Sequence, residues 1–437
     1  MIRQLVILAG GKGTRLKAAT GGLPKPLVPI GDIPILEHQV RQASRTNFTE
    51  VVFLTSYRSQ LIADHFRDGS QFGVNFKYHV DETPLGTAGA LLAVLDQLDD
   101  DFLLLYGDAM HDVDLRSFAN FHEQQPGAAA SLFVHPNDHP HDSDLVELDP
   151  QGRILAFHGY PHPPDTCYRN IVNAGLYALR KSFFESFCSE TVPCDFAKDL
   201  FPKLLATNHI LFGYSSREYI KDMGTVERLE KVNADFRSGK VARMNRNRAM
   251  PAVFLDRDGT VLAYRSFLSK TEEVHLRDGS AQAICTIHEA GYLAVLVTNQ
   301  PVIARGECTY AELERIHGKM EHMLATEGNT YLDAIYYCPH HPDSGYPGEI
   351  PDLKVWCNCR KPATGMISHA TTDLNIDLRA SFLIGDSIRD WNTAENAQIP
   401  GLLLRGGEAS DSLLDTFPVK SVFQNLLTAV RSLPVYA

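Results

Sequence analysis

Short apolar runs that alternate with amphipathic stretches are the feature that most constrains the fold of this 437-residue chain. Residues 4–9, 51–55 and 102–106 have the length of buried strands, and residues 35–43 and 88–98 show helical periodicity between them. This alternation predicts an α/β fold with a mostly parallel sheet that helices cover on both faces. Ligands bind at the carboxyl ends of the strands in such sheets, so the residues after each run are the candidates for function.

The alternation stops at residues 237–250, a basic stretch with few large apolar side chains, and restarts at Ala252. A single hydrophobic core rarely grows beyond about 250–300 residues. We therefore expect two domains, residues 1–236 and 251–437, joined by a linker at 237–250. The first has the pattern of a Rossmann-like fold with a mixed, mostly parallel sheet, and the second is an independent α/β unit.

The composition narrows the class of protein. A net charge of −12 disfavours a general nucleic-acid binder, which needs a basic face to neutralise phosphates. No apolar run reaches the ~18 residues of a membrane span, and the N-terminus has the pattern of a buried strand entering a loop rather than of a signal peptide. We expect a cytoplasmic protein with neither nucleic acid nor membrane as partner.

A glycine-rich turn follows the first apolar run. Its backbone N–H groups can approach phosphates closely, while Arg15 can neutralise a leaving pyrophosphate and Lys25 can hold charge at the reacting centre. The candidate nucleotide-binding residues here are Leu8, Gly10, Gly11, Gly13 and Thr14. The alternative is a tight turn with surface cations, which the nearby Pro24-Lys25-Pro26 disfavours.

With that Pro-Lys-Pro, the turn resembles the signature of the sugar-phosphate nucleotidyltransferases over about the first 235 residues. The resemblance implies a nucleoside-facing loop (Gly86, Thr87, Gly89), a metal-binding acid (Asp108), a sugar-contacting segment (Asn173, Gly175) and a second metal acid (Asp222). Two carboxylates on one Mg²⁺ suit nucleotide phosphates, although Asp222 could instead cap a helix. The family often has Glu-Lys-Pro near the sugar, where residues 157–161 here contain no Lys.

Two carboxylates directly follow the first apolar run of the second half. Asp256 and Asp258 are two residues apart and can face one site. Asp256 is placed to attack phosphorus as a nucleophile and Asp258 to serve as general acid and base, with Mg²⁺ to offset their charge. The chain then adds Thr298 and Asn299 for phosphoryl oxygens, Lys361 for positive charge, and Asp386, with Asp390 close by, for the metal. Asp-x-Asp-Gly-Thr alone could be a calcium loop, but the ordered set resembles the haloacid dehalogenase superfamily and implies its Rossmannoid fold.

Three cysteines and a histidine lie close together in the same half. Cys338, His340, Cys357 and Cys359 form a closed tetrahedral set for structural Zn²⁺, which would pin a long loop and present Arg360 and Lys361. His341 could replace His340, and the alternative is two cysteine-containing loops without metal. This loop resembles that of the heptose bisphosphate and histidinol-phosphate phosphatases over about residues 251–405, as does Ile303-Ala304-Arg305-Gly306; Pro301-Val302 departs from the usual Ser-Gly.

The two resemblances together imply a bifunctional enzyme of heptose metabolism. The phosphatase would remove the 7-phosphate of D-glycero-α-D-manno-heptose 1,7-bisphosphate, and the transferase would pass GMP from GTP to heptose 1-phosphate. Alternatives are other substrates, such as histidinol phosphate and a different NDP-sugar, or one half acting as a non-catalytic sensor or scaffold. Because pyrophosphorylases are often oligomers, the resemblance also implies a homo-oligomer.

Overall fold

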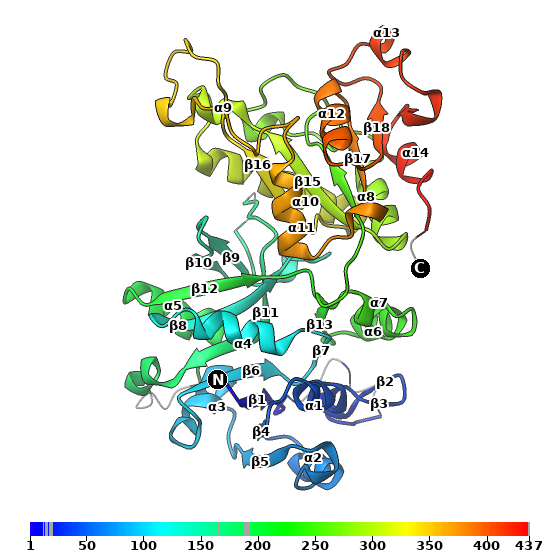
Figure 1. Cartoon of the computed structure of the whole chain (residues 1–437). Coiled ribbons are helices and arrows are strands. Elements are labelled where there is room, and N and C mark those ends of the chain that lie inside the picture. The colour runs from blue at the N-terminus through cyan, green and yellow to red at the C-terminus, as the bar shows by residue number, and fades with distance from the viewer. Residues whose placement is uncertain (12, 14–15, 17–20, 164–165, 188–192, 436–437) are drawn as a thin grey trace. The chain divides into compact units, whose positions relative to one another are not determined.

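The computed structural model describes residues 1–11, 13, 16, 21–163, 166–187 and 193–435. The chain divides into two compact units (Figure 1). Unit 1 comprises Met1–His135, Val146–Gly159 and Asn173–Asn247, and unit 2 comprises Pro136–Leu145, Tyr160–Val172 and Arg248–Ala437. The domain boundaries expected from the sequence, at residues 236 and 251, stay a prediction.

A nine-stranded mixed sheet forms the centre of unit 1. Its parallel part has the order β6 (Asp101–Tyr106), β1 (Gln4–Leu8), β4 (Glu50–Thr55) and β5 (Asn75–Val80). Beyond β6 lie the antiparallel β11 (Val172–Arg180), then β9 (Leu145–Leu148) and β10 (Ile154–His158). Strand β8 (Ala128–His135) also pairs with β11, and β12 (Ile210–Ser215) pairs with β8. The expected α/β fold with a mixed sheet is confirmed for this half.

Two small sheets and seven α-helices complete unit 1 among the described residues. The small sheets pair β7 (Ala109–His111) with β13 (Ile220–Asp222) and β2 (Pro29–Ile30) with β3 (Ile33–Pro34). The helices are α1 (Ile35–Arg45), α2 (Ser59–Phe66), α3 (Gly86–Leu92), α4 (Leu115–Glu123), α5 (Phe201–Ala206), α6 (Val226–Arg237) and α7 (Lys240–Arg243). Helix α1 buries Leu36, Val40 and Ala43, which fall on one face at helical spacing. Helix α7 lies within the stretch expected as a linker.

Unit 2 is built on a six-stranded sheet whose paired strands are all parallel. The order is β16 (Ala334–Cys338), β15 (Leu293–Asn299), β14 (Ala252–Leu255), β17 (Phe382–Gly385), β18 (Gly401–Leu404) and β19 (Val422–Phe423). The helices are α8 (Ser280–Glu289), α9 (Pro301–Ala304), α10 (Tyr310–Gly328), α11 (Gly365–Leu374), α12 (Ile388–Asn396), α13 (Asp411–Leu414) and α14 (Leu426–Val430). A capping box between Thr309 and Glu312 fixes the start of α10.

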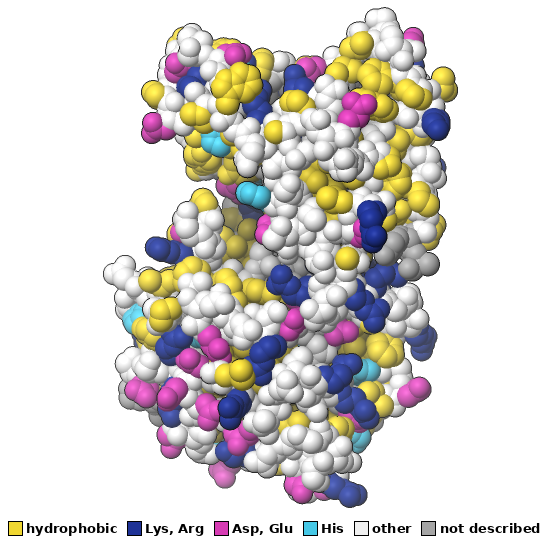
Figure 2. Space-filling view, viewed as in Figure 1, with side chains coloured by type: hydrophobic (Ala, Val, Ile, Leu, Met, Phe, Trp, Pro, Cys, Tyr) yellow, Lys and Arg dark blue, Asp and Glu magenta, His cyan; other side chains and the backbone are white. Residues whose placement is uncertain are grey.

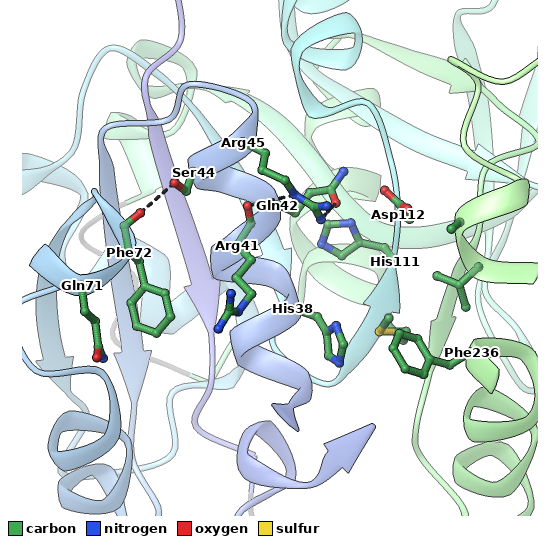
Figure 3. A pocket seen from close by; sticks show the side chains of 13 residues that line it. His38, Arg41, Gln42, Ser44, Arg45, Gln71, Phe72, His111, Asp112 and Phe236 are labelled. Carbon is green, nitrogen blue, oxygen red and sulfur yellow. Dashed lines mark hydrogen bonds between the residues drawn. The ribbon is translucent and has the colours of Figure 1, made fainter. Parts of the chain in front are cut away.

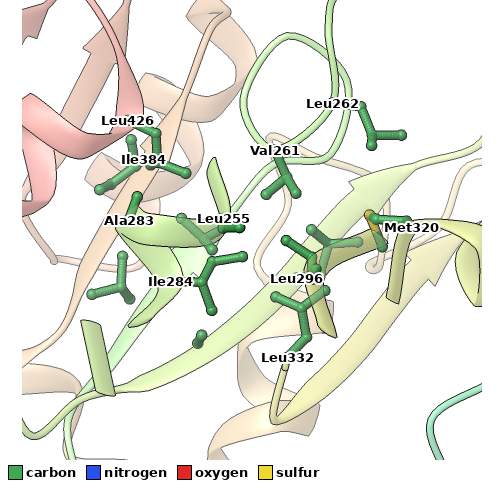
Figure 4. Close-up of a cluster of buried hydrophobic side chains, with 14 of the residues drawn as sticks. Leu255, Val261, Leu262, Ala283, Ile284, Leu296, Met320, Leu332, Ile384 and Leu426 are labelled. Carbon is green, nitrogen blue, oxygen red and sulfur yellow. The ribbon is translucent and has the colours of Figure 1, made fainter. Parts of the chain in front are cut away.

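The core of unit 2 explains why its strands are nearly all apolar. Leu255, Leu296 and Ile384 come from three neighbouring strands and are fully buried. They face side chains of the covering helices, among them Ile284 of α8 and Leu426 of α14 (Figure 4). Burial of each such side chain stabilises the fold by about 1.5–3 kcal/mol, which fixes the carboxyl ends of β14, β15 and β17 at one edge of the sheet.

The surface of unit 1 mixes both signs of charge. On the face shown in Figure 2, basic and acidic side chains alternate over this unit without a large field of one sign. Within the described part of the chain, no helix combines the length and the hydropathy that crossing a membrane would require.

Candidate functional sites

The carboxyl ends of β1, β4 and β6 surround a cavity of about 580 Å³ in unit 1. Six of the residues singled out in the sequence line it together with Asp108: Leu8, Gly10, Gly11, Lys25, Gly86 and Thr87. They meet because β1 is parallel to both neighbours, which brings the residues after each strand to the same edge. A cavity of this size suits a small-molecule ligand.

Lys25 and Asp108 form the charged centre of this cavity. The Lys25 Nζ lies 2.8 Å from Asp108 Oδ2, and both side chains are largely buried. Gly13 lies against the Lys25 stem, since a Cβ at position 13 would come within 2.8 Å of Lys25 Cγ. Thr14 and Arg15, both expected at the phosphates, lie outside the described residues.

The segment that resembles a nucleoside-facing loop forms the start of α3. Gly86 adopts φ +77°, and a Cβ there would lie 2.4 Å from the carbonyl oxygen of Cys194, so only glycine fits without a shift. The same carbonyl accepts the backbone N–H of Gly89 at 3.2 Å, and the Thr87 hydroxyl donates to Asp195 at 2.8 Å. Gly86 and Thr87 therefore border the cavity, whereas Gly89 packs behind it, beside the chain at 194–195.

The two acids expected to share a metal are neighbours in the backbone. Asp222 pairs with Ala109 in the β7–β13 ladder, and the N–H of Met223 donates to the carbonyl of Asp108 at 3.0 Å. The Asp222 carboxylate accepts Arg228 Nη1 at 3.0 Å. The side chain that caps α6 is Thr225, which accepts the N–H of Arg228, so Asp222 does not serve as the cap.

Asn173 and Gly175 lie on β11, next to β6, and outside the lining of the cavity. Asn173 Nδ2 donates to the Tyr177 hydroxyl at 3.0 Å, and Gly175 has φ +71°. A Cβ on Gly175 would come within 3.1 Å of the Tyr106 ring, and Tyr106 lines the cavity. Neither Asn173 nor Gly175 is among the described residues that line it. Residue 157, in the segment where the family lysine is missing, is a phenylalanine that stacks on Phe201.

The cavity also contains residues that sequence reasoning missed. Asp81 and Tyr106 line it, and burial raises the pKa of the Asp81 carboxyl above its ordinary value. Asp81 directly follows β5, whose sequence Asn-Phe-Lys-Tyr-His-Val mixes apolar and polar side chains, so no apolar run marked this position. Tyr106 is the last residue of the apolar run 102–106, so its place at the end of a strand was an available signal.

Unit 2 gathers three carboxylates at the edge formed by β14 and β17. Oxygen atoms of Asp256, Asp386 and Asp390 lie within 4.8 Å of one another. Lys361 Nζ lies 2.7 Å from Asp256 and 2.5 Å from Asp390, and the lysine is almost fully buried. Asp258 lies outside this group, and Asp390, which the sequence placed only nearby, belongs to it. Asp390 is fixed by the start of α12, where Ser387 donates to it from both N and Oγ.

The positive charge near these three carboxylates does not balance their negative charge, as the raised pKa values of two of them indicate. Burial raises the pKa of Asp256 to about 6, although Lys361 acts in the opposite direction. Burial and the neighbouring Asp256 raise the pKa of Asp386 to about 8. The Lys361 ammonium contacts two of the three carboxylates, Asp256 and Asp390. The third, Asp386, is enclosed by the backbone at Gly259 and Gly407. The oxygen-rich, negatively charged donor set fits a divalent cation.

Asp258 is held next to this group by a buried cation. Arg257 Nη2 donates to Asp258 at 2.9 Å and Gln300 Nε2 donates to it at 3.2 Å. Arg257 is fully buried, and its other end lies 3.4 Å from His317 Nε2. Asp256 and Asp258 both line a cavity of about 280 Å³, as expected from their spacing.

The remaining predicted phosphatase residues border the same cavity. Asn299 and Lys361 exchange two hydrogen bonds: Asn299 Nδ2 donates to the Lys361 carbonyl, and the Lys361 N–H donates to Asn299 Oδ1. Thr298 accepts Gln300 Nε2 at 2.9 Å. The cationic side chains that line the cavity are Arg265, Arg305, Arg360, Lys361 and Arg389. Such a lining suits a ligand with more than one anionic group.

The cysteine and histidine side chains of unit 2 also converge. The sulfur atoms of Cys338, Cys357 and Cys359 lie 3.2–3.5 Å apart without a disulfide, and His340 Nδ1 lies 3.3 Å from Cys359. A tetrahedral ion with metal–sulfur bonds of about 2.3 Å needs donors roughly 3.7 Å apart, close to this spacing. The cluster can hold a metal ion. His341 lies outside the cluster and lines the cavity of Asp256 and Asp258 instead.

Unit 1 has a second cavity of about 490 Å³ between α1 and β7, and none of its described lining residues was singled out in the sequence (Figure 3). His38, Gln42 and Arg45 of α1 line it with His111 of β7 and Phe236 of α6. His111 is buried, and neither ring nitrogen has a hydrogen-bond partner among the described residues. Burial, with His38 and Arg45 adding to it, lowers the pKa of His111 to about 3, so the ring is neutral.

Comparison with known proteins relates each half of the chain to a protein family. Residues 4–239, more than half of the chain, match the family model described as nucleotidyl transferase, and residues 358–429 match a HAD-hydrolase-like model. The D-glycero-beta-D-manno-heptose-1,7-bisphosphate 7-phosphatase of Yersinia pestis is 40% identical over 161 residues, which are 37% of this chain and 83% of the relative. The mannose-1-phosphate guanylyltransferase of Mycobacterium tuberculosis is 30% identical over 236 residues, which are 54% of this chain and 64% of the relative.

A solved structure is also similar. The D,D-heptose 1,7-bisphosphate phosphatase from B. bronchiseptica, complexed with magnesium and phosphate, is 33% identical, with 42% of this chain and 97% of that chain covered at a TM-score of 0.36. The resemblances seen in the sequence motifs are confirmed by the family matches. The chain belongs to the nucleotidyl transferase family through residues 4–239, and it also belongs to the family of the heptose bisphosphate 7-phosphatases.

Proposed function

We propose that the chain is a bifunctional enzyme that catalyses two consecutive steps of heptose activation. It removes the 7-phosphate of D-glycero-α-D-manno-heptose 1,7-bisphosphate, and it transfers GMP from GTP to the resulting heptose 1-phosphate. The products are phosphate, pyrophosphate and GDP-heptose. The observation that carries the proposal is the convergence of Asp256, Asp386 and Asp390 around Lys361, beside Asp258, on a chain whose other half contains the strand-end cavity of Lys25 and Asp108.

The phosphatase step follows from the two carboxylates that border one cavity. An oxygen of Asp256 attacks phosphorus, and the bond between phosphorus and the C7 oxygen breaks while Asp258 protonates that oxygen. Water then attacks the aspartyl phosphate, Asp258 takes the proton, and inorganic phosphate leaves. Asp256 is the better nucleophile, since its partner Asp258 is held by Arg257 and Gln300 at the position of a proton carrier.

The acidic group supports a magnesium site for this step. Asp256, Asp386 and Asp390 would hold Mg²⁺, whose charge neutralises the phosphoryl oxygens. Lys361 adds a fixed positive charge beside Asp256 and Asp390, and Asn299 fixes the lysine backbone. The chain thus contributes nucleophile, proton carrier and positive charge at the end of one sheet.

The transfer step belongs to the cavity of unit 1. An oxygen of the sugar 1-phosphate attacks the α-phosphorus of GTP, the bond to the β-phosphate breaks, and pyrophosphate leaves. Lys25 neutralises phosphate charge, while Asp108 and Asp222 are the proposed Mg²⁺ ligands. Gly10 and Gly11 leave their backbone close to the phosphates, and Gly86 and Thr87 border the nucleoside.

The cluster of three cysteines and His340 is proposed as a Zn²⁺ site with a structural role. Four protein donors complete a tetrahedral shell and leave no position for substrate. The ion would pin the loop between Cys338 and Cys359, which carries His341 and leads directly into Arg360 and Lys361, all three of which line the phosphatase cavity.

The proposal also specifies guanine as the nucleotide base and the α-anomer as the form of the sugar bisphosphate. The relative from Mycobacterium tuberculosis supports guanylyl transfer by its name, and the phosphatase relatives are named for the β-anomer of the bisphosphate. Both anomers therefore belong in the assay, and thermal shifts with GTP, ATP, CTP, UTP and dTTP identify the nucleotide that stabilises the folded chain.

The test is a coupled assay with the purified full-length protein, Mg²⁺, GTP and either anomer of the bisphosphate. We expect one phosphate and one pyrophosphate per sugar, and GDP-heptose by mass spectrometry, with the α-anomer. The absence of both phosphate and GDP-heptose with either anomer would overturn the proposal. Histidinol phosphate is the control substrate, and we expect it to be cleaved more slowly than the bisphosphate.

A further inference from the structure

One cation of the phosphatase cavity lies between two aromatic rings. The guanidinium carbon of Arg305 lies 3.9 Å from the ring centre of Phe267 and 4.4 Å from that of Tyr346. Its Nη2 also donates to the Tyr346 hydroxyl at 3.2 Å. The two rings hold the planar guanidinium group, so Arg305 loses little side-chain entropy when it binds a ligand.

Arg305 still has hydrogen-bonding capacity that the protein does not use. Only 9% of the residue is exposed, yet its Nε has no hydrogen-bond partner. Among the described residues no carboxylate forms an ion pair with it. A buried donor without an acceptor costs free energy, and a buried guanidinium without a counter-charge costs more. Because Arg305 lines the same cavity as Asp256, an anionic group of a ligand in that cavity can satisfy both needs.

The other cations of the cavity are already engaged. Lys361 contacts two carboxylates, and Arg360 donates to a backbone carbonyl. The guanidinium groups of Arg265 and Arg389 form ion pairs with glutamates of the same unit. Arg305 is therefore the cation of this cavity that is most available to a second anionic group, after the first has reached Asp256.

The chain strains its backbone to keep one of the two rings in place. Phe267 adopts φ +57°, a conformation that is unfavourable for a bulky L-residue, and about half of the residue is exposed. The burial of Phe267 is thus modest, and its clearest contact is the face of Arg305. The Phe267 ring therefore positions the Arg305 guanidinium group and contributes little to the hydrophobic core of unit 2.

We propose that Arg305 binds the second phosphate of the substrate and makes the phosphatase select a sugar bisphosphate over a monophosphate. The inference rests on the proposed function, which supplies a substrate with two phosphates. Arg305 contacts the phosphate that is not cleaved, so it determines binding and specificity, whereas Asp256 and Asp258 perform the reaction. Phe267 and Tyr346 are positioning residues, since they act through Arg305.

The test compares two substrates on the full-length protein: the heptose 1,7-bisphosphate and the heptose 7-phosphate, which lacks the second phosphate. Loss of a charge-assisted hydrogen bond predicts that Arg305→Met raises the KM for the bisphosphate about 10- to 100-fold. The kcat for the bisphosphate and both constants for the monophosphate stay near wild type. Arg305→Lys keeps the charge without the planar fork and gives an intermediate KM.

Two further variants separate binding from folding. Phe267→Ala removes one ring and raises the KM for the bisphosphate several-fold. The control Arg379→Met removes an exposed cation of the same unit that pairs with Asp377 outside the cavity, and it leaves the KM unchanged. Hydrolysis of the monophosphate by the same preparations reports that unit 2 is folded. An equal loss with both substrates, or an unchanged KM in both Arg305→Met and Phe267→Ala, would overturn the inference. Failure of the wild type to cleave the bisphosphate would instead reject the proposed function.

Discussion

The side-chain nitrogen of Lys361 lies 2.7 Å from an oxygen of Asp256, the residue that directly follows β14. The lysine is almost fully buried, and the side chain of Asp256 is 13% exposed. The contact holds the nucleophilic carboxylate in one orientation while burial raises its pKa. The same ammonium group contacts Asp390, so a single lysine connects two of the three clustered acids.

Replacing Lys361 by methionine tests this arrangement. The change leaves two buried carboxylates without their cation, and breaking a buried pair in this way costs about 3–5 kcal/mol of stability. Loss of a fixed charge at the phosphoryl group lowers kcat by about 10²–10³-fold. Phosphate release and urea unfolding measure the two effects, with the exposed Lys420→Met as control. Full phosphatase activity in Lys361→Met would contradict the assignment.

Asp108 is expected to matter only for nucleotide transfer. Asp108→Asn removes the partner of Lys25 and a proposed metal ligand, and we expect the transferase kcat to fall at least about 100-fold while phosphate release is unchanged. Asp101→Asn is the matched control, because Asp101 stands at the opposite end of β6 and pairs with Arg180. Equal transferase losses in both variants would show that Asp108 acts through stability alone.

The cysteine cluster predicts one tightly bound zinc ion per chain. Cys357→Ser removes one of four donors, so metal analysis should find the zinc lost, and the Tm of unit 2 should fall by at least about 5 °C. Cys285→Ser, in α8 and outside the cluster, keeps the zinc. A wild-type protein without zinc after purification in metal-replete buffer would refute the site.

His111 predicts an acid-sensitive stability of unit 1. Its pKa of about 3 lies below the 6.5 of an unfolded histidine, so the unfolded chain takes up a proton first as the pH falls. The contribution of His111 is complete above pH 6.5 and is lost progressively down to about pH 3, with about 2 kcal/mol lost at pH 5.

Hydrogen exchange of the β1 and β6 amides measures that loss. Between pH 7.5 and pH 5, His111→Leu should lose about 2 kcal/mol less opening free energy than the wild type. The exposed His369→Leu should behave as the wild type. An identical pH dependence in wild type and His111→Leu would show that the ring is not buried neutral.

The strand-end residues could be predicted from the sequence because parallel strands gather their carboxyl ends at one edge. Asp256 and Asp258 follow one run and border one cavity, as their spacing indicated. Asp108 follows another run, and it contacts Lys25 beside the other sheet. The cysteine and histidine spacing likewise anticipated a compact cluster. These are local signals, or signals that the topology of an α/β fold converts directly into proximity.

Contacts made by returning loops could not be predicted in the same way. The sequence around Gly89 does not indicate that the carbonyl of Cys194 accepts its N–H. The sequence around Arg305 likewise does not indicate that the rings of Phe267 and Tyr346 pack against its guanidinium group. Such contacts depend on how long connections fold back, which neither periodicity nor spacing specifies. For a related reason, the sequence placed Asp390 only near the metal acids and not among them. Its position in the acidic group depends on its hydrogen bonds with Ser387 at the start of α12.

The most direct measurement of the central claim, two separate active sites on one chain, uses Asp256→Asn. With heptose 1,7-bisphosphate, GTP and Mg²⁺, this variant should release no phosphate and make no GDP-heptose. Addition of heptose 1-phosphate to the same protein should restore GDP-heptose at the wild-type rate. If Asp256→Asn were folded but unable to use heptose 1-phosphate, or if it still released phosphate from the bisphosphate, the account would be contradicted.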